Sequence, residues 1–171
     1  MGDSELIAIR ATAAGEAQAL RELRLRALAQ APEAFASDIA GETGREPAHW
    51  ARLVAGGDDQ TVLVAQHRDG GLVGMAGGYW FDRRRGIVQL WGLWVDPGLR
   101  GGGTGAALVA GVVEWAARLG ARALRLGVID PDGDGLGVTA FYRRLGFATV
   151  GAPAPMRSDP ARLVSYMIRL L

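Results

Sequence analysis

The sequence predicts a mixed α/β domain in which an antiparallel meander is followed by a β-α-β-α unit. Three β-rich runs separated by short polar loops lie at Thr61–Gln66, Leu72–Phe81 and Ile87–Val95. An amphipathic helix and a compact apolar strand follow at Thr104–Leu119 and Ala123–Ile129. Hairpin-linked strands pair antiparallel, whereas strands joined through a helix pair parallel, so the predicted sheet is mixed.

The residues before the meander predict one strand and two helices. Leu6–Arg10 alternates weakly between apolar and polar residues, which favours a strand. Thr12 is a suitable N-cap for a helix that runs to Gln30, because leucine and alanine recur there at helical spacing. Ala31–Glu46 shows no regular pattern, and a short helix is expected at Pro47–Ala55, with proline in its first turn.

The residues after the apolar strand predict a second short helix and two terminal strands. The helix is expected at Val138–Leu145, and the strands at Phe147–Val150 and Leu163–Leu171. Two segments combine proline, glycine and aspartate, namely Asp130–Gly137 and Gly151–Ala161, so both are expected to be mobile surface loops.

Length and charge limit the classes of protein that fit. The chain has 171 residues and a net charge of +1, so we expect one domain over residues 1–171. With this charge and no basic tail, the sequence gives no electrostatic footprint for nucleic acid or an anionic membrane. Since no apolar segment approaches roughly 20 residues and the N-terminus is acidic, we expect no membrane span and no secretory leader.

Three residue types exclude particular chemistries. Cysteine is absent, which excludes disulfides, a thiol nucleophile and thiolate metal sites, and is compatible with the cytoplasm, where we expect the protein to act. His49 and His67 are too isolated to form an imidazole cluster, so no metal is expected. All 19 basic residues are arginine, so the lysine of a Walker-type phosphate loop has no candidate.

The segment Leu93–Ala106 carries the clearest chemical signal, because a buried-looking strand passes through a short loop into a helix. A helix start presents unpaired N–H groups and a partial positive charge. Gly101, Gly103 and Gly105 lack the Cβ atoms that would keep a phosphate away, and Arg100 adds a cation. The combination predicts an anion-binding turn suited to a pyrophosphate.

This segment resembles motif A of the GCN5-related N-acetyltransferases, the GNAT family, in which (Q/R)xxGx(G/A) binds the pyrophosphate of acetyl-CoA. The matching residues are Arg100-x-x-Gly103-x-Gly105. Downstream, Phe141–Phe147 resembles the end of motif B, so motif A would cover about residues 87–119 and motif B about residues 123–147. The resemblance is good from about residue 61 to 150 and holds only in outline before that.

The resemblance implies a GNAT-like fold in which acetyl-CoA lies between a splayed central pair of strands. The backbone of Val95 would hold the pantetheine amide, the N–H near Leu93 would polarise the thioester carbonyl, and Tyr142 would protonate the departing sulfur. The implied contacts with acetyl-CoA are Leu93, Val95, Arg100, Gly101, Gly103, Thr104, Gly105, Ala106 and Tyr142.

The resemblance also implies the reaction. A primary amine attacks the acetyl carbonyl directly, and a tetrahedral intermediate collapses to an amide and the CoA thiolate, so no enzyme nucleophile is needed. The acceptor expected here is a small-molecule amine, with peptide N-termini and lysine side chains as further acceptors. Many relatives dimerise, so a homodimer is compatible with the family.

The group that accepts the amine proton is left open. Relatives often carry a glutamate on the strand before motif A, where this chain has Gln89, which cannot act as a base. Asp82, His49, Glu33 or a chain of water molecules are the alternatives.

The same strand contributes the expected acceptor-site residues, Gln89 and Trp91. Strict alternation would place Trp91 and Trp94 on opposite faces of the strand. Trp91 would then share a face with Gln89, Leu93 and Val95.

Two other functions compete with the transferase. A non-catalytic acyl-CoA-binding module is favoured by Gln89 and by Gly135, which stands where relatives frequently have an asparagine. A dinucleotide-binding domain is suggested by Gly101-x-Gly103-x-x-Ala106 and by Asp130 at the end of the next strand. Two features argue against this second alternative. A Rossmann strand enters its first glycine almost directly, whereas Asp96–Arg100 intervenes here, and the preceding strands form a meander and not the start of a parallel sheet.

Overall fold

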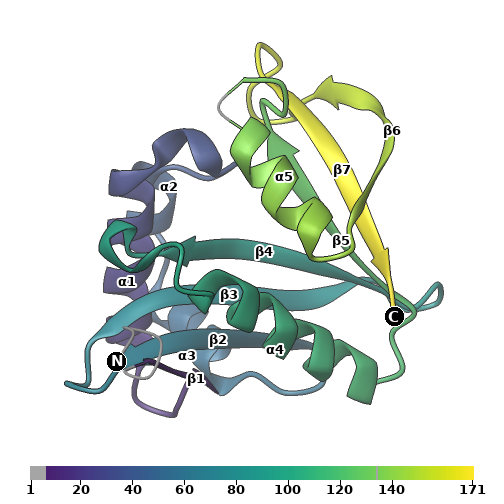
Figure 1. The fold of residues 1–171 in the computed structure, drawn as a ribbon. Coiled ribbons are helices and arrows are strands. Elements are labelled where there is room, and N and C mark those ends of the chain that lie inside the picture. Colours follow the sequence, from purple (N-terminus) through teal and green to yellow (C-terminus); the bar gives the residue numbers. More distant parts are fainter. Residues whose placement is uncertain (1–6, 134) are drawn as a thin grey trace.

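The computed structural model describes residues 7–133 and 135–171, which form a seven-stranded mixed sheet with helices on both faces (Figure 1). The strand order is β1-β2-β3-β4-β5-β7-β6. The elements are β1 (Ile7–Ala11), α1 (Ala17–Gln30), η2 (Pro32–Ala34), α2 (Ile39–Thr43), α3 (Pro47–Ala55), β2 (Gln60–His67), β3 (Leu72–Asp82), β4 (Ile87–Val95), η3 (Pro97–Leu99), α4 (Thr104–Arg118), β5 (Ala123–Ile129), α5 (Leu136–Arg144), β6 (Ala148–Pro155) and β7 (Leu163–Leu170). The mixed α/β class is confirmed.

The sheet consists of two antiparallel parts that meet at a short parallel junction. Strands β1 to β4 form the predicted meander, while β5, β7 and β6 form the second part. Within the described residues, β4 and β5 pair only from Ile87–Gln89 to Ala123–Arg125. Figure 1 shows the two strands diverging beyond this junction. The splayed central pair is thus present.

Two apolar clusters fix the helices on opposite faces of the sheet. Helices α4 and α5 pack on one face, where Leu108 and Val112 of α4 are fully buried in the same apolar cluster as Leu124 of β5. Helices α1 and α3 pack on the other face, through residues such as Leu23 and Trp50. Burial on both faces explains why the central strands are almost continuously apolar.

The expected N-cap at Thr12 is wrong. Helix α1 begins at Ala17 after Glu16, and the Thr12 hydroxyl instead donates to the carbonyl of Val54 at 3.2 Å. The Glu16 carboxylate accepts from the backbone N–H of Ala13 at 2.6 Å, so it closes the turn that precedes the helix. Leu6, the expected first residue of the first strand, lies outside the described residues.

Two segments expected to be irregular contain regular structure. Helix α2 lies within residues 31–46, and the Asp38 carboxylate caps it by accepting from the Gly41 N–H at 2.7 Å. Strand β6 continues to Pro155, past the expected end at Val150. Its pairing with β7 is irregular between Val150 and Ala154 and resumes at Ala154. Helix α5 begins two residues earlier than expected, at Leu136.

Candidate active site

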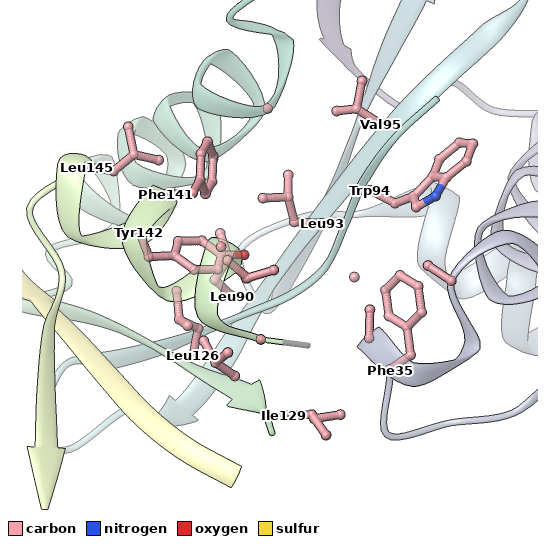
Figure 2. A pocket seen from close by; sticks show the side chains of 18 of the residues that line it. Phe35, Leu90, Leu93, Trp94, Val95, Leu126, Ile129, Phe141, Tyr142 and Leu145 are labelled. Atoms are coloured by element: carbon pink, nitrogen blue, oxygen red, sulfur yellow. The ribbon is translucent and has the colours of Figure 1, made fainter. Parts of the chain in front are cut away.

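A cavity of about 690 Å³ opens where β4 and β5 separate (Figure 2). Its walls come from residues 90–95 of β4, residues 126–129 of β5, the start of α4, one side of α5 and residues 31–35 after α1. Five segments therefore meet at the point where backbone pairing between β4 and β5 ends.

The glycine turn at the start of α4 forms one wall. Gly103 is the N-cap with φ of 88°, and Gly101 has φ of 83°, a left-handed backbone that favours glycine. A Cβ at either residue would meet nothing within 4 Å, so the backbone conformation and not crowding requires glycine. The N–H groups of the first turn, with the partial positive charge of this 15-residue helix, make the wall attractive to an anion.

Arg100 lines the cavity beside this turn and is held by two hydrogen bonds. Its Nε donates to the Val95 carbonyl at 3.0 Å, and its Nη2 donates to Gln30 Oε1 at 2.8 Å. Gly105 and Ala106 also line the cavity, whereas Thr104 is buried and, among the described residues, is not part of the lining.

A bulge in β4 determines which side chains enter the cavity. Trp91 pairs with Gly77 and Trp94 with Met75, so Gly92 and Leu93 together stand opposite one residue of β3, and Gly92 has φ of 65°. The extra residue reverses the alternation of side chains beyond it.

The expectation that the two tryptophans lie on opposite faces is therefore wrong. Both rings face α1, where the guanidinium of Arg24 lies 5.8 Å from the Trp91 ring and that of Arg26 lies 5.5 Å from the Trp94 ring. Leu93 packs with the opposite apolar cluster, so it does not share a face with Trp91. Leu93 and Val95 both line the cavity, and Figure 2 shows Leu93 between Tyr142 and Trp94.

Tyr142 of α5 presents the phenol expected from the sequence. Its side chain is 6% exposed and lines the cavity, and its ring packs edge-to-face on Phe141 and Phe147. Desolvation by burial raises the pKa of the Tyr142 hydroxyl well above its ordinary value. The hydroxyl consequently keeps its proton throughout the physiological pH range.

The structure separates the three side chains considered as a base. Glu33 lines the cavity. Asp82 lies at the β3–β4 hairpin and pairs with Arg85 at 3.6 Å, and His49 lies on α3, where burial lowers its pKa. Among the described residues, Glu33 is thus the carboxylate that the cavity lining contains.

Gln89, expected near the acceptor, lies in the parallel junction. It pairs with Arg125 of β5 and Tyr79 of β3, and its Nε2 donates to the Leu90 carbonyl at 2.8 Å. In the described part of the chain it is not among the residues that line the cavity.

Gly135 is required by its surroundings. A Cβ at this position would stand 2.3 Å from the carbonyl oxygen of Ile129, so an asparagine could not occupy the position without a shift of the backbone. Asp130, the acid considered for ribose binding, accepts from Arg162 Nε at 2.9 Å and from the backbone N–H of Leu163 at 3.2 Å. Its carboxylate holds the β6–β7 connection against β5.

Arg24 lies directly behind the cavity wall, and sequence reasoning missed it. Its guanidinium is buried beside Phe35, Trp91 and Gly92, three residues that line the cavity. Burial lowers the pKa of Arg24, and Glu42 partly opposes that shift. One of the three arginines of α1 gave no signal, since only tertiary packing brings it to the bulge.

Comparison with known proteins identifies the family. The sequence profile of the Acetyltransferase (GNAT) family matches residues 21–147. This chain belongs to the GNAT family of acetyltransferases, as the two sequence motifs predicted. No curated protein sequence matches it significantly.

Solved structures share the fold over nearly the whole chain. A GNAT acetyltransferase from Streptococcus pneumoniae has a TM-score of 0.78 at 21% identity, covering 96% of this chain and 99% of the other. A GCN5-related N-acetyltransferase from Kribbella flavida has a TM-score of 0.74 at 21% identity, covering 98% and 99%. The structure of yncA from Salmonella typhimurium, with its cofactor acetyl-CoA, has a TM-score of 0.71 at 20% identity, covering 96% and 94%.

Two further properties follow from the described residues. None of their helices is both long and apolar enough to cross a bilayer. No three histidine, aspartate or glutamate side chains in residues 7–133 and 135–171 are grouped as metal ligands would be.

Proposed function

We propose that this GNAT acetyltransferase transfers the acetyl group of acetyl-CoA to a primary amine of a small molecule. One observation carries the proposal: the opening between β4 and β5 contains both the glycine turn of α4 and the Tyr142 phenol. An anion-binding wall and a proton donor thus border the same cavity.

The glycine turn is the candidate site for the pyrophosphate of the coenzyme. Gly101, Gly103, Gly105 and Ala106 line the cavity and leave its wall free of bulky side chains. Arg100 stands beside them with its guanidinium already oriented by Gln30 and the Val95 carbonyl. Positive-φ glycines at a helix N-terminus fit a diphosphate because backbone N–H groups can approach it closely. Thr104 would contribute only through its backbone.

The unpaired part of β4 is the candidate site for the acetyl-pantetheine arm. Residues 90–95 line the cavity beyond the last pair between β4 and β5, so their main-chain groups can bind an extended ligand. We assign the backbone of Val95 to the pantetheine amide and the N–H of Leu93 to the acetyl carbonyl oxygen, where it would stabilise developing negative charge.

Tyr142 is assigned the role of general acid. The amine nitrogen adds to the acetyl carbon to give a tetrahedral intermediate. When this intermediate collapses, the carbon–sulfur bond breaks and the phenol donates its proton to the departing sulfur. The raised pKa keeps that proton available. The nitrogen loses its extra proton to water as the amide forms, and water returns a proton to the phenolate.

Glu33 is assigned the transfer of the amine proton to solvent. A protonated amine has no lone pair for attack, so its proton must leave first. Glu33 supports this role by its place in the cavity lining and by its exposure, which allows a water molecule to bridge carboxylate and amine.

The test is release of free thiol from acetyl-CoA in the presence of a panel of primary amines. We expect amine-dependent release that falls about 100-fold in Tyr142→Phe. Binding of CoA without amine-dependent release would support a non-catalytic acyl-CoA-binding module. Thermal stabilisation by NAD but not by CoA would support the dinucleotide-binding alternative.

A further inference from the structure

Arg24 places a cation directly behind one wall of the cavity. Its guanidinium carbon lies 4.6 Å from the centre of the Phe35 ring, and the side chain is 5% exposed. Its Nη1 would stand 3.7 Å from a Cβ at Gly92. A Cβ at residue 92 would therefore be in van der Waals contact with this cation, so the guanidinium lies directly beside Gly92.

The hydrogen bonding of this guanidinium is incomplete. Nη2 donates to Ser37 Oγ at 2.7 Å and to Glu42 Oε1 at 3.5 Å. Nε and Nη1 are buried without a hydrogen-bond partner among the described residues. Buried polar groups are almost always paired, so two unpaired donors on one buried cation indicate a missing partner.

A second arginine shows what complete pairing looks like in this protein. Arg10 donates from Nε to Gln66 Oε1 at 2.8 Å, and from Nη1 and Nη2 to the Glu16 carboxylate at 2.9 and 2.6 Å. All three of its nitrogens are satisfied although it is less buried than Arg24.

The charge around Arg24 is positive. Glu42 is the carboxylate in contact with it, and the same carboxylate also faces Arg45, with 3.8 Å between Arg45 Nε and Glu42 Oε2. Two guanidinium groups thus share one carboxylate. An additional anion would balance the pair and satisfy the unpaired donors.

We propose that Arg24 binds a carboxylate carried by the acceptor, so that the preferred substrates are amino acids or other amino carboxylates. This inference rests on the proposed function and narrows its substrate class. The acceptor carboxylate would enter between Phe35 and Gly92, with the rings of Phe35 and Trp91 beside the carbon skeleton. Its amine would then lie on the side of Leu93 and Tyr142, which Figure 2 shows across the cavity from Phe35.

The experiment compares free amino acids with the corresponding carboxamides as acceptors in the thiol-release assay. Each pair differs in the negative charge and in the pKa of the amine beside it. The ratio of kcat/KM, with each value corrected for the fraction of unprotonated amine, therefore reports recognition of that charge. We expect the acids to be at least about 10-fold better with the wild-type protein. In Arg24→Gln the acids should lose most of this advantage while the carboxamides change by less than about 2-fold.

Matched variants separate recognition from folding. Arg26→Gln removes a neighbouring arginine of α1 that packs on Trp94, and it should preserve the preference for acids. Glu42→Gln removes the competing carboxylate and should increase the preference, which provides a second test if Arg24→Gln does not fold. Calorimetric titration of CoA verifies that each variant retains the coenzyme site.

The outcomes distinguish the two proposals. Equal rates for acids and carboxamides, or an unchanged preference in both Arg24→Gln and Glu42→Gln, would overturn the role of Arg24 and leave the transferase intact. If no amine of either class releases thiol, the transferase itself is wrong, and the inference about Arg24 is wrong with it.

Discussion

The two sides of the cavity are built in different ways. The side assigned to the coenzyme comes from residues 93–106, which act mainly through backbone groups, and from Tyr142 of α5. The side assigned to the acceptor combines Arg24, Phe35 and Trp91, which lie on separate elements and act through their side chains. Backbone groups can hold a coenzyme with few demands on side-chain identity, whereas side chains select the acceptor.

The largest effect expected on the coenzyme side follows replacement of Tyr142 by phenylalanine. Loss of the general acid should reduce kcat about 100-fold and leave KM for acetyl-CoA nearly unchanged, because the ring remains. Steady-state kinetics measure both. Tyr79→Phe, at an exposed position of β3, is the control and should keep full activity. An equal decrease in the two variants would remove Tyr142 from the reaction.

The pKa of Tyr142 adds a stability test to the same variant. The folded-state pKa is raised, so the contribution of this hydroxyl is fully present below the unfolded pKa of about 10 and is lost above it. Between about pH 9.5 and 11, thermal unfolding should show a smaller loss of stability for Tyr142→Phe than for the wild-type protein. Parallel losses would contradict the burial of the phenol.

Gly103→Ala tests whether the backbone at the start of α4 binds the coenzyme. Gly120, near the end of the same helix, has φ of 76° and equal open space, so Gly120→Ala is the matched control. Each substitution should reduce stability by about 1 kcal/mol through left-handed strain. Only Gly103→Ala should weaken CoA binding, by about 10-fold or more, in calorimetry. Similar dissociation constants for both variants would count against the glycine turn.

Glu33→Gln tests whether this carboxylate carries the amine proton to solvent. Loss of the carboxylate should lower kcat about 10-fold at pH 7, because a water chain can still carry the proton. Excess amine at high pH should restore much of the rate, since more of the acceptor is then unprotonated. Glu22→Gln, on the exposed surface of α1, is the control. No rescue by pH would indicate that Glu33 has a role other than proton transfer.

The smallest effect concerns Glu16, whose two carboxylate oxygens both accept hydrogen bonds from Arg10. The hydrogen bonds from Arg10 and then from the Ala13 N–H lower the pKa of Glu16 from 4.5 to about 2. Its stabilisation is therefore present above about pH 4.5 and is lost as the pH falls toward 2. Glu16→Gln should cost about 1 kcal/mol at pH 7 after allowance for solvent screening, and unfolding curves of the two proteins should converge near pH 2.

Local patterns in the sequence were sufficient for most of the fold. The meander, α4 and β5 were predicted because apolar periodicity and glycine-containing turns are local properties. The N-cap at Thr12 was wrongly predicted because several residues near the start of α1 are compatible with a cap. In the structure, Glu16 closes the turn that precedes the helix. The predicted β6 was too short because Gly151 and Pro153 indicated a loop. In the structure the pairing with β7 resumes beyond them, at Ala154, after an irregularity.

The site was predictable only where its residues belong to short local motifs. The glycine pattern and the aromatic pair at Phe141 and Tyr142 identified the coenzyme side. The bulge at Gly92 could not be anticipated, because it depends on the register with β3, and it reversed the expected faces of the tryptophans. The position of Arg24 could not be predicted, because it depends on the packing of α1 against Trp91 and Gly92 of β4 and not on a local sequence pattern.

The central claim is that acetyl-CoA binds in the opening between β4 and β5, and amide hydrogen exchange with and without CoA tests it most directly. The account predicts that CoA slows exchange in peptides covering residues 90–95 and 101–106 and leaves β1 and β2 unchanged. Protection confined to other segments, or none at saturating CoA, would contradict it.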